Sequence, residues 1–173
     1  MKIKLAIAVA LMLAACAPPQ SGAEATVRGI YDQVQQHIGR EVTPREAIPM
    51  SDDLAALLER AEAAADARDE PFIDGDLAAN CQDCQSLTGL EIGPQAGPEP
   101  VPAERGHTLL EARFVINGNE ERAVIYDLIE TPHGWRVDNI LAEGFNLRAE
   151  AESYLADATD ANAAGAVAAP PSP

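Results

Sequence analysis

Residues 107–141 read HTLLEARFVINGNEERAVIYDLIETPHGWRVDNIL, and this stretch predicts three consecutive β-strands. Apolar and polar side chains alternate along the first strand, which is typical of a strand with one buried face. The buried set would be Leu110, Ala112, Phe114 and Ile116. The segments Asn117–Asn119 and Thr131–Gly134 are rich in turn-forming residues and separate the strands. Two short turns in succession predict an antiparallel meander, because such connections join only antiparallel neighbours.

Helical spacing of apolar residues dominates the chain before this meander. We predict one helix over residues 22–39 and a second over residues 52–69, with Ser51 as the cap of the second. A third helix is expected over residues 145–155. The segment 71–85 should be a loop or short helix, and 89–105 should be irregular because it is rich in Pro and Gly.

Helices followed by a run of antiparallel strands indicate an α+β fold. We expect the N-terminal helices to pack on one face of a curved antiparallel sheet, and the C-terminal helix to close the structure. The single domain would span residues 23–156. Residues 157–173 would form a disordered tail rich in Ala and Pro, because they contain too few large apolar side chains to offset the entropy lost on ordering.

The N-terminus is similar to the signal of bacterial lipoproteins. Lys2 and Lys4 precede an apolar run, residues 5–15, that is too short to remain as a membrane span. The run ends in two alanines followed by Cys16. This pattern implies that residues 1–15 are removed, that Cys16 is acylated with chains such as palmitate, and that residues 16–22 form a tether. Since Ala17 stands where Asp would favour inner-membrane retention, we expect a periplasm-facing protein on the outer membrane if the source is Gram-negative.

The chain is strongly acidic, with 12 Lys and Arg against 28 Asp and Glu and a formal net charge of −16. Loss of Lys2 and Lys4 with the signal would make this charge more negative by two. Nucleic acid is therefore excluded as a partner, because its binding depends on basic side chains that neutralise phosphates. Anionic lipid surfaces would also repel the chain, so membrane attachment would have to be covalent, through the lipid on Cys16.

Three segments carry a resemblance to a known family: Val27–Tyr31, Pro71–Asp76 and Gly134–Ile140. Their order resembles the family called domain of unknown function 3828, which contains short secreted or lipid-anchored bacterial proteins. That family is similar in fold to the nuclear transport factor two-like superfamily, in which a curved sheet wraps helices into a cone. The resemblance spans residues 23–147 and implies this fold, but it implies no activity.

Cys81 and Cys84 enclose two residues, and three interpretations compete. An oxidising compartment favours a small structural disulfide. A redox pair would need positive charge or a helix start to stabilise a thiolate, whereas Asp83 lies between the two thiols. A metal site would need a second pair of ligands, and the nearby sequence offers none. We therefore favour the disulfide.

Asp74 and Asp76 lie in an acidic loop with Asn80 and Asp83 downstream. Their oxygen atoms would suit calcium, but the spacing does not match the calcium-binding loop of EF-hands. Turn formation by the aspartates is the favoured alternative.

Tyr31, Trp135 and Asp138 are the residues that we would place near a cavity. Some members of the superfamily named above are enzymes with an Asp base in the cone, so Asp138 is the candidate base. Alternation puts Trp135 and Asp138 on opposite faces unless the strand contains a bulge. The favoured alternative is an ion pair between Asp138 and an arginine on a neighbouring strand, Arg113 or Arg122, with Trp135 in the core.

No nucleophile elbow, phosphate loop or metalloprotease helix occurs in the sequence. We therefore predict no catalytic residue, cofactor or metal, and favour a binding module over an enzyme. Its ligand would be a small apolar molecule or another envelope protein, with Tyr31, Asp74, Asp76, Trp135 and Asp138 as the candidate binding residues. The first alternative is an enzyme of the same fold that uses a pocket Asp for acid–base chemistry. The second is an envelope-stress or toxin-neutralising protein whose acidic surface is the functional face.

Overall fold

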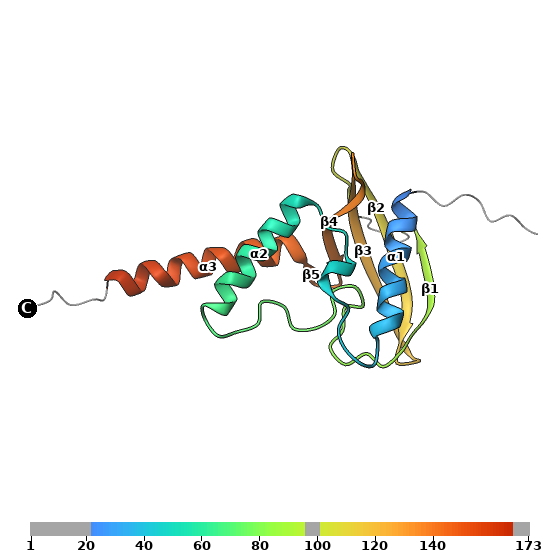
Figure 1. Cartoon of the computed structure of the whole chain (residues 1–173), viewed down its shortest axis with the longest axis horizontal. Coiled ribbons are helices and arrows are strands. Elements are labelled where there is room, and N and C mark those ends of the chain that lie inside the picture. Colours follow the sequence, from blue (N-terminus) through green and yellow to red (C-terminus); the bar gives the residue numbers. More distant parts are fainter. Residues whose placement is uncertain (1–21, 96–100, 168–173) are drawn as a thin grey trace, which may run out of the picture.

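The computed structural model describes residues 22–95 and 101–167, with side chains described as far as Thr159. The predicted lipoprotein signal, Cys16 and most of the tether therefore lie outside the described residues. Within these ranges, three α-helices and a five-stranded antiparallel sheet confirm the α+β fold (Figure 1). The strand order β1-β2-β3-β4-β5 is that of a simple meander.

The strands of the meander follow closely the boundaries that the turns predict. They are β2 (His107–Ile116), β3 (Glu120–Thr131) and β4 (Gly134–Ala142). Two strands were not predicted. β1 (Leu87–Gly93) pairs with β2 despite its glycines, with a register shift between Thr88 and Glu91, and β5 (Phe145–Asn146) pairs with the end of β4.

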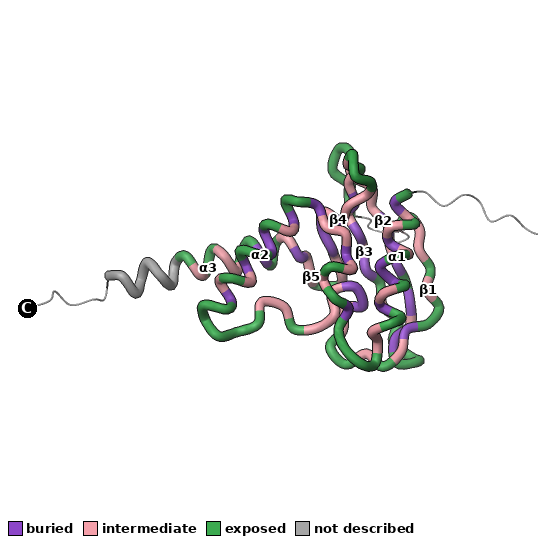
Figure 2. The backbone as a smooth tube through the Cα atoms, viewed as in Figure 1, coloured by how far each residue is buried: buried purple, intermediate pink, exposed green. Residues whose placement is uncertain are grey.

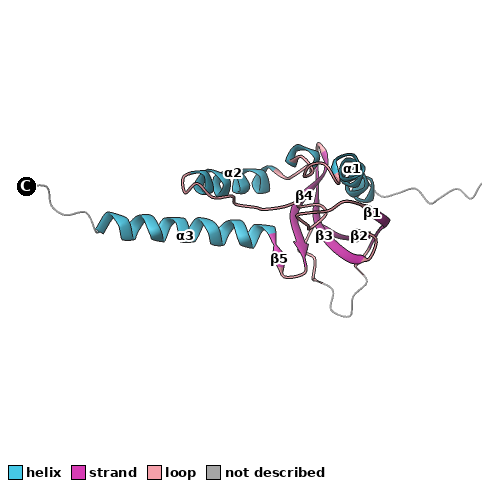
Figure 3. Ribbon diagram, turned by 90° about the horizontal axis from the view of Figure 1, so that it is seen from below, coloured by secondary structure: helices cyan, strands magenta, loops and turns pink. Residues whose placement is uncertain are grey.

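The first helix, α1 (Gly22–His37), lies across one face of the sheet, and the sheet curves around it (Figure 3). Its apolar stripe is buried: Val27, Ile30, Tyr31 and Val34 are at most 1% exposed. They meet the inward side chains of β2 and β3, so the core lies between helix and sheet (Figure 2). We call this the covered face and the opposite one the outer face.

The second helix, α2 (Asp52–Asp66), begins at the predicted cap. The Ser51 hydroxyl accepts a hydrogen bond from the backbone N–H of Leu54 at 3.1 Å. A short 3-10 helix, Arg45–Ala47, precedes it. The backbone of Ser51 and Val137 joins this segment to β4, because the Ser51 N–H donates to the Val137 carbonyl at 2.8 Å.

The third helix, α3 (Leu147–Val167), packs beside α2, and the two helices extend away from the sheet (Figure 1). It continues beyond Asp157, where the sequence predicted a disordered tail to begin. Alanine is abundant there and has the highest helix propensity, so backbone preference favours a helix even though few side chains are available for a core. Residues 168–173 lie outside the described residues. No helix in the described ranges is both long and apolar enough to cross a membrane.

Candidate functional site

A groove of about 800 Å³ lies over β2 and β3, with Gly89 and Glu91 of β1 also in its lining. Its apolar lining includes Val115, Ala123 and Ile125. These side chains alternate with the buried Phe114, Ile116 and Val124, so they belong to the outer face. Since α1 packs on the opposite face, this helix does not cover the groove.

Charged side chains of both signs border the groove: Glu91, Arg113, Glu121, Arg122 and Glu143. Arg113 is bound to Glu111 at 2.6 Å, and Arg122 is bound to Glu120. The site therefore combines an apolar floor with a rim that presents both acidic and basic groups. Sequence reasoning missed it. The available signal was the alternation of Val115, Ala123 and Ile125 with core residues, which indicates that they face away from the core but not that they line a groove.

Tyr31 was predicted to lie near a cavity, but it is buried in the core. Its hydroxyl donates to the Ala78 carbonyl at 2.9 Å and accepts from the Tyr126 hydroxyl at 3.4 Å. Burial raises the pKa of both tyrosines, and the nearby Asp76 carboxylate adds to the rise. Tyr31 therefore helps to position the loop that contains Ala78 against the sheet.

Asp76 organises that loop through its carboxylate. One oxygen accepts from the N–H groups of Ala78 and Ala79, each at 2.9 Å, and the other accepts from the Thr43 N–H at 2.7 Å. Asp74 is exposed, and its carboxylate accepts from the Gln82 amide at 2.8 Å. These contacts agree with turn formation, the favoured interpretation. In the described ranges, no three His, Cys, Asp or Glu side chains come together in a way that could hold a metal ion.

Cys81 and Cys84 are joined by a disulfide. The Cys84 carbonyl accepts from the Gly39 N–H at 2.9 Å, just beyond the end of α1. The Cys81 carbonyl accepts from the Asp76 N–H at 2.8 Å. The bonded pair thus ties the Asp76 loop to the C-terminal end of α1.

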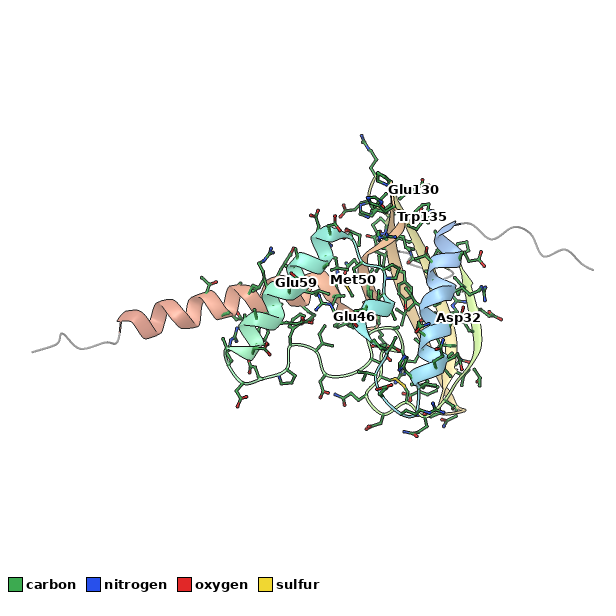
Figure 4. The ribbon with its side chains drawn as sticks, viewed as in Figure 1. Asp32, Glu46, Met50, Glu59, Glu130 and Trp135 are labelled. Atoms are coloured by element: carbon green, nitrogen blue, oxygen red, sulfur yellow. A yellow bond between two sulfur atoms is a disulfide. The ribbon has the colours of Figure 1, made fainter. Side chains whose placement is uncertain are left out.

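Trp135 is half-buried at the start of β4, where it packs against the core. A Cβ atom on Gly22 would lie only 2.7 Å from the indole ring, so the first residue of α1 rests directly on this side chain. Figure 4 shows Trp135 beside Glu130, its partner in register on β3.

Asp138 forms an ion pair, but its partner differs from the predicted one. Its carboxylate binds Arg148 of α3 at 2.7 Å and accepts from the Ser51 hydroxyl at 2.5 Å. Arg148 also donates to the Asp138 carbonyl at 2.7 Å. A bulge opposite Asp127 and Leu128 adds one residue to β4 here, which corrects the strict alternation expected of this strand.

The structure thus places the predicted residues in separate settings. Tyr31 of α1 contacts the loop that contains Asp76, Trp135 contacts the first turn of α1, and Asp138 joins β4 to α2 and α3. Strand periodicity could not reveal these contacts, because the partners come from segments distant in sequence.

The sequence analysis also missed an interacting pair of side chains, His107 on β2 and Asp127 on β3. The His107 ring and the Asp127 carboxylate are 2.8 Å apart, and their side chains are 17% and 15% exposed. Burial raises the pKa of Asp127, although the hydrogen bond and charge of His107 act in the opposite direction. Nothing in the sequence marks this pair, because the two residues are diagonal neighbours on adjacent strands and meet only through the pairing of β2 with β3.

Comparison with known proteins yields little. No protein-family model and no curated protein matches the sequence, so the resemblance to domain of unknown function 3828 stays a prediction. Among solved structures, the chain is similar to a phospholipid-binding protein from Ralstonia solanacearum, solved in complex with a phospholipid. The two are 17% identical, with a TM-score of 0.46 over 78% of this chain and 86% of that one. A likeness at this level carries no inference about a ligand.

Proposed function

We propose that this chain is a lipid-anchored envelope protein that binds a small amphipathic ligand in the outer-face groove. The observation that carries the binding proposal is the groove itself. Its volume of about 800 Å³ falls within the range of small-molecule sites, which combine an apolar lining with a few polar groups. The cell-envelope location rests on the N-terminal signal, with Cys16 as the acylated residue and the outer membrane as the expected site.

The chemistry of the groove favours an amphipathic ligand over a wholly apolar one. Val115, Ala123 and Ile125 would contact a hydrocarbon portion, while Arg113 and Glu121 border the same space with opposite charges. A polar head group can meet such a rim without leaving a charge uncompensated. The ligand class is therefore a compact molecule with an apolar body and a charged or zwitterionic end.

The competing enzyme hypothesis loses its main support. It required Asp138 to face a pocket without an arginine partner, so that burial would raise its pKa. Instead the carboxylate is bound to Arg148 and to the Ser51 hydroxyl, so both contacts occupy the group that would have to act as the base.

Binding can be tested with 1-anilinonaphthalene-8-sulfonate, an amphipathic fluorescent probe. Ala123 is exposed on the groove floor, so Ala123→Trp should fill the groove and weaken probe binding about tenfold, which corresponds to about 1.4 kcal/mol. Ala123→Ser keeps the side chain small, and Ala63→Trp places the same indole on the exposed side of α2. Both controls should bind the probe like the unmodified chain. Equal binding by all four proteins would exclude the groove as the site.

The anchor is tested separately. Cys16→Ser should abolish acylation and release the protein from membranes in soluble form, because one thiol carries the attachment. Continued membrane association of this variant would contradict the anchor without affecting the groove.

A further inference from the structure

The meander places its connections alternately at two ends of the sheet. One end, which we call the tether end, holds the start of α1 at Gly22, the end of β1 at Gly93, the start of β2 at His107 and the β3–β4 turn before Gly134. The contact between Gly22 and the Trp135 indole brings the first turn of α1 onto this end of the sheet.

The other end, which we call the disulfide end, holds the C-terminal end of α1 and the β2–β3 turn. The N–H of Gly39 donates to Cys84 at 2.9 Å, and the N–H of Asn117 donates to Ser86 at 3.1 Å. The Asn117 side chain also accepts from the N–H of Gln85 at 2.8 Å. The length of α1 separates the two ends (Figure 1).

The length of the tether decides which end can reach a bilayer. Six residue steps separate Cys16 from Gly22, and a fully extended chain spans at most about 22 Å over that distance. The 16 residues of α1 are about 24 Å long at the usual helical rise. A tether starting at Gly22 is therefore too short to run the length of α1 and place the disulfide end on the membrane.

The side chains at the tether end suit a lipid head-group region. Trp135 is half-buried and has an amphipathic indole, which is enriched where membrane meets water. Val101, which follows β1 in the chain, is 39% exposed, so an apolar side chain also reaches the surface near the end of β1. Charges near Trp135 have both signs, with Glu130 opposite it and Arg136 next to it.

We propose that the tether end is a membrane-docking surface, with Trp135 at the level of the lipid head groups and the disulfide end facing away from the bilayer. This inference rests on the proposed acylation of Cys16. It adds an orientation: α1 stands with its N-terminus toward the membrane, and the arm formed by α2 and α3 extends to the side.

Trp135 is the only tryptophan of the chain, so its fluorescence reports directly on this surface. The full acylated protein would be reconstituted in vesicles of phosphatidylethanolamine and phosphatidylglycerol, with and without phospholipid brominated near the head group. We expect brominated lipid to quench Trp135, and aqueous iodide to quench it less than in the Cys16→Ser protein, which lacks the anchor.

The matched control moves the indole to the other end. Asn119 is exposed in the β2–β3 turn, so the double variant Trp135→Phe, Asn119→Trp reports on the disulfide end. Its fluorescence should respond to iodide but not to brominated lipid. Circular dichroism of the double variant checks that the fold is retained, while the unmodified protein tests the proposal without any substitution near the core.

The outcomes separate the orientation from the anchor. If the protein floats with the vesicles but brominated lipid leaves Trp135 unaffected, or quenches the indole at position 119 equally, the docking surface is wrong and the anchor stands. If the protein does not float with the vesicles at all, the anchor is wrong, and the docking surface that depends on it is rejected as well.

Discussion

The two faces of the sheet differ in what they contact and in how much their side chains contribute to stability. The covered face meets α1 through fully buried residues such as Ile30, Tyr126 and Leu128. The outer face carries apolar side chains that are only partly buried or exposed, Val115, Ala123 and Ile125, among charged neighbours. The first arrangement maximises buried area, whereas the second leaves a hollow that a ligand can fill. The comparison therefore separates the residues that hold the fold from those that line the proposed binding groove.

The largest expected effect distinguishes the faces directly. Ile30→Ala should lower the free energy of unfolding by about 3 kcal/mol, because Ile30 is 0% exposed and its removal leaves a cavity. Ile125→Ala should cost about 1 kcal/mol, because this side chain is already partly in water. Urea unfolding of both variants measures the difference. Equal losses would show that the outer face is as much a part of the core as the covered face.

The next effect concerns the bulge of β4, where the sheet is joined to α2 and α3. Asp138→Ala should destabilise the protein by about 2 kcal/mol, because it leaves the part-buried Arg148 guanidinium and the Ser51 hydroxyl without this carboxylate. Asp32→Ala, at an exposed position of α1, should have almost no effect. A double-mutant cycle with Arg148→Ala should give a coupling energy of about 1 kcal/mol, and no coupling would refute the ion pair.

A smaller effect tests the hydrogen bonds within the covered face. Tyr31→Phe should cost about 1.5 kcal/mol, since it removes the hydroxyl that serves both the Ala78 carbonyl and the Tyr126 hydroxyl. Tyr126→Phe removes only the longer of these bonds and should cost less.

Because of the same two tyrosines, we expect the free energy of unfolding to depend on pH in the alkaline range. Their pKa is raised in the folded state, whereas tyrosines of the unfolded chain ionise near 10.0. Stability should therefore be fully present below pH 10 and decline as the pH rises above that value. The decline should be shallower in Tyr126→Phe than in the unmodified protein. An identical pH dependence would mean that Tyr126 ionises alike in both states.

The smallest effect belongs to the outer-face pair of His107 and Asp127. Burial raises the pKa of Asp127 above its usual 3.8, so the folded state favours the protonated carboxyl. The stabilisation that this raised pKa gives the folded state is complete below pH 3.8. It is lost as the pH rises through the pKa of Asp127 in the folded protein. Because Asp127 is incompletely buried, Asp127→Asn should change this pH dependence by less than about 1 kcal/mol. Unfolding measured from acidic to neutral pH would show a smaller decline in the variant. A steeper decline would contradict the sign of the shift.

Local sequence patterns predicted the covered face well. The alternation of Leu110, Ala112 and Phe114 indicated a half-buried strand, and all three are buried. Ser51 was correctly assigned as a helix cap, because a cap depends on residues within one turn. β1 was missed, since Gly89 and Gly93 weaken strand propensity and only pairing with β2 makes this segment a strand.

The candidate sites depended far less on local pattern. The Cys81–Cys84 disulfide and the turn built by Asp76 were predicted, because their partners lie a few residues away. The groove was not predicted, since its floor and rim come from separate strands.

By itself, the sequence determined the meander, the two N-terminal helices, the acidic charge and the prediction of an acylated Cys16. These features depend on periodicity, turn residues and composition, which are properties of residues close together in the sequence. Only the tertiary structure decided that Asp138 meets Arg148, that Tyr31 reaches Tyr126, and that Trp135 lies against the first residue of α1. Those contacts join residues far apart in the chain, and they form only when the packing of helix on sheet brings the residues together.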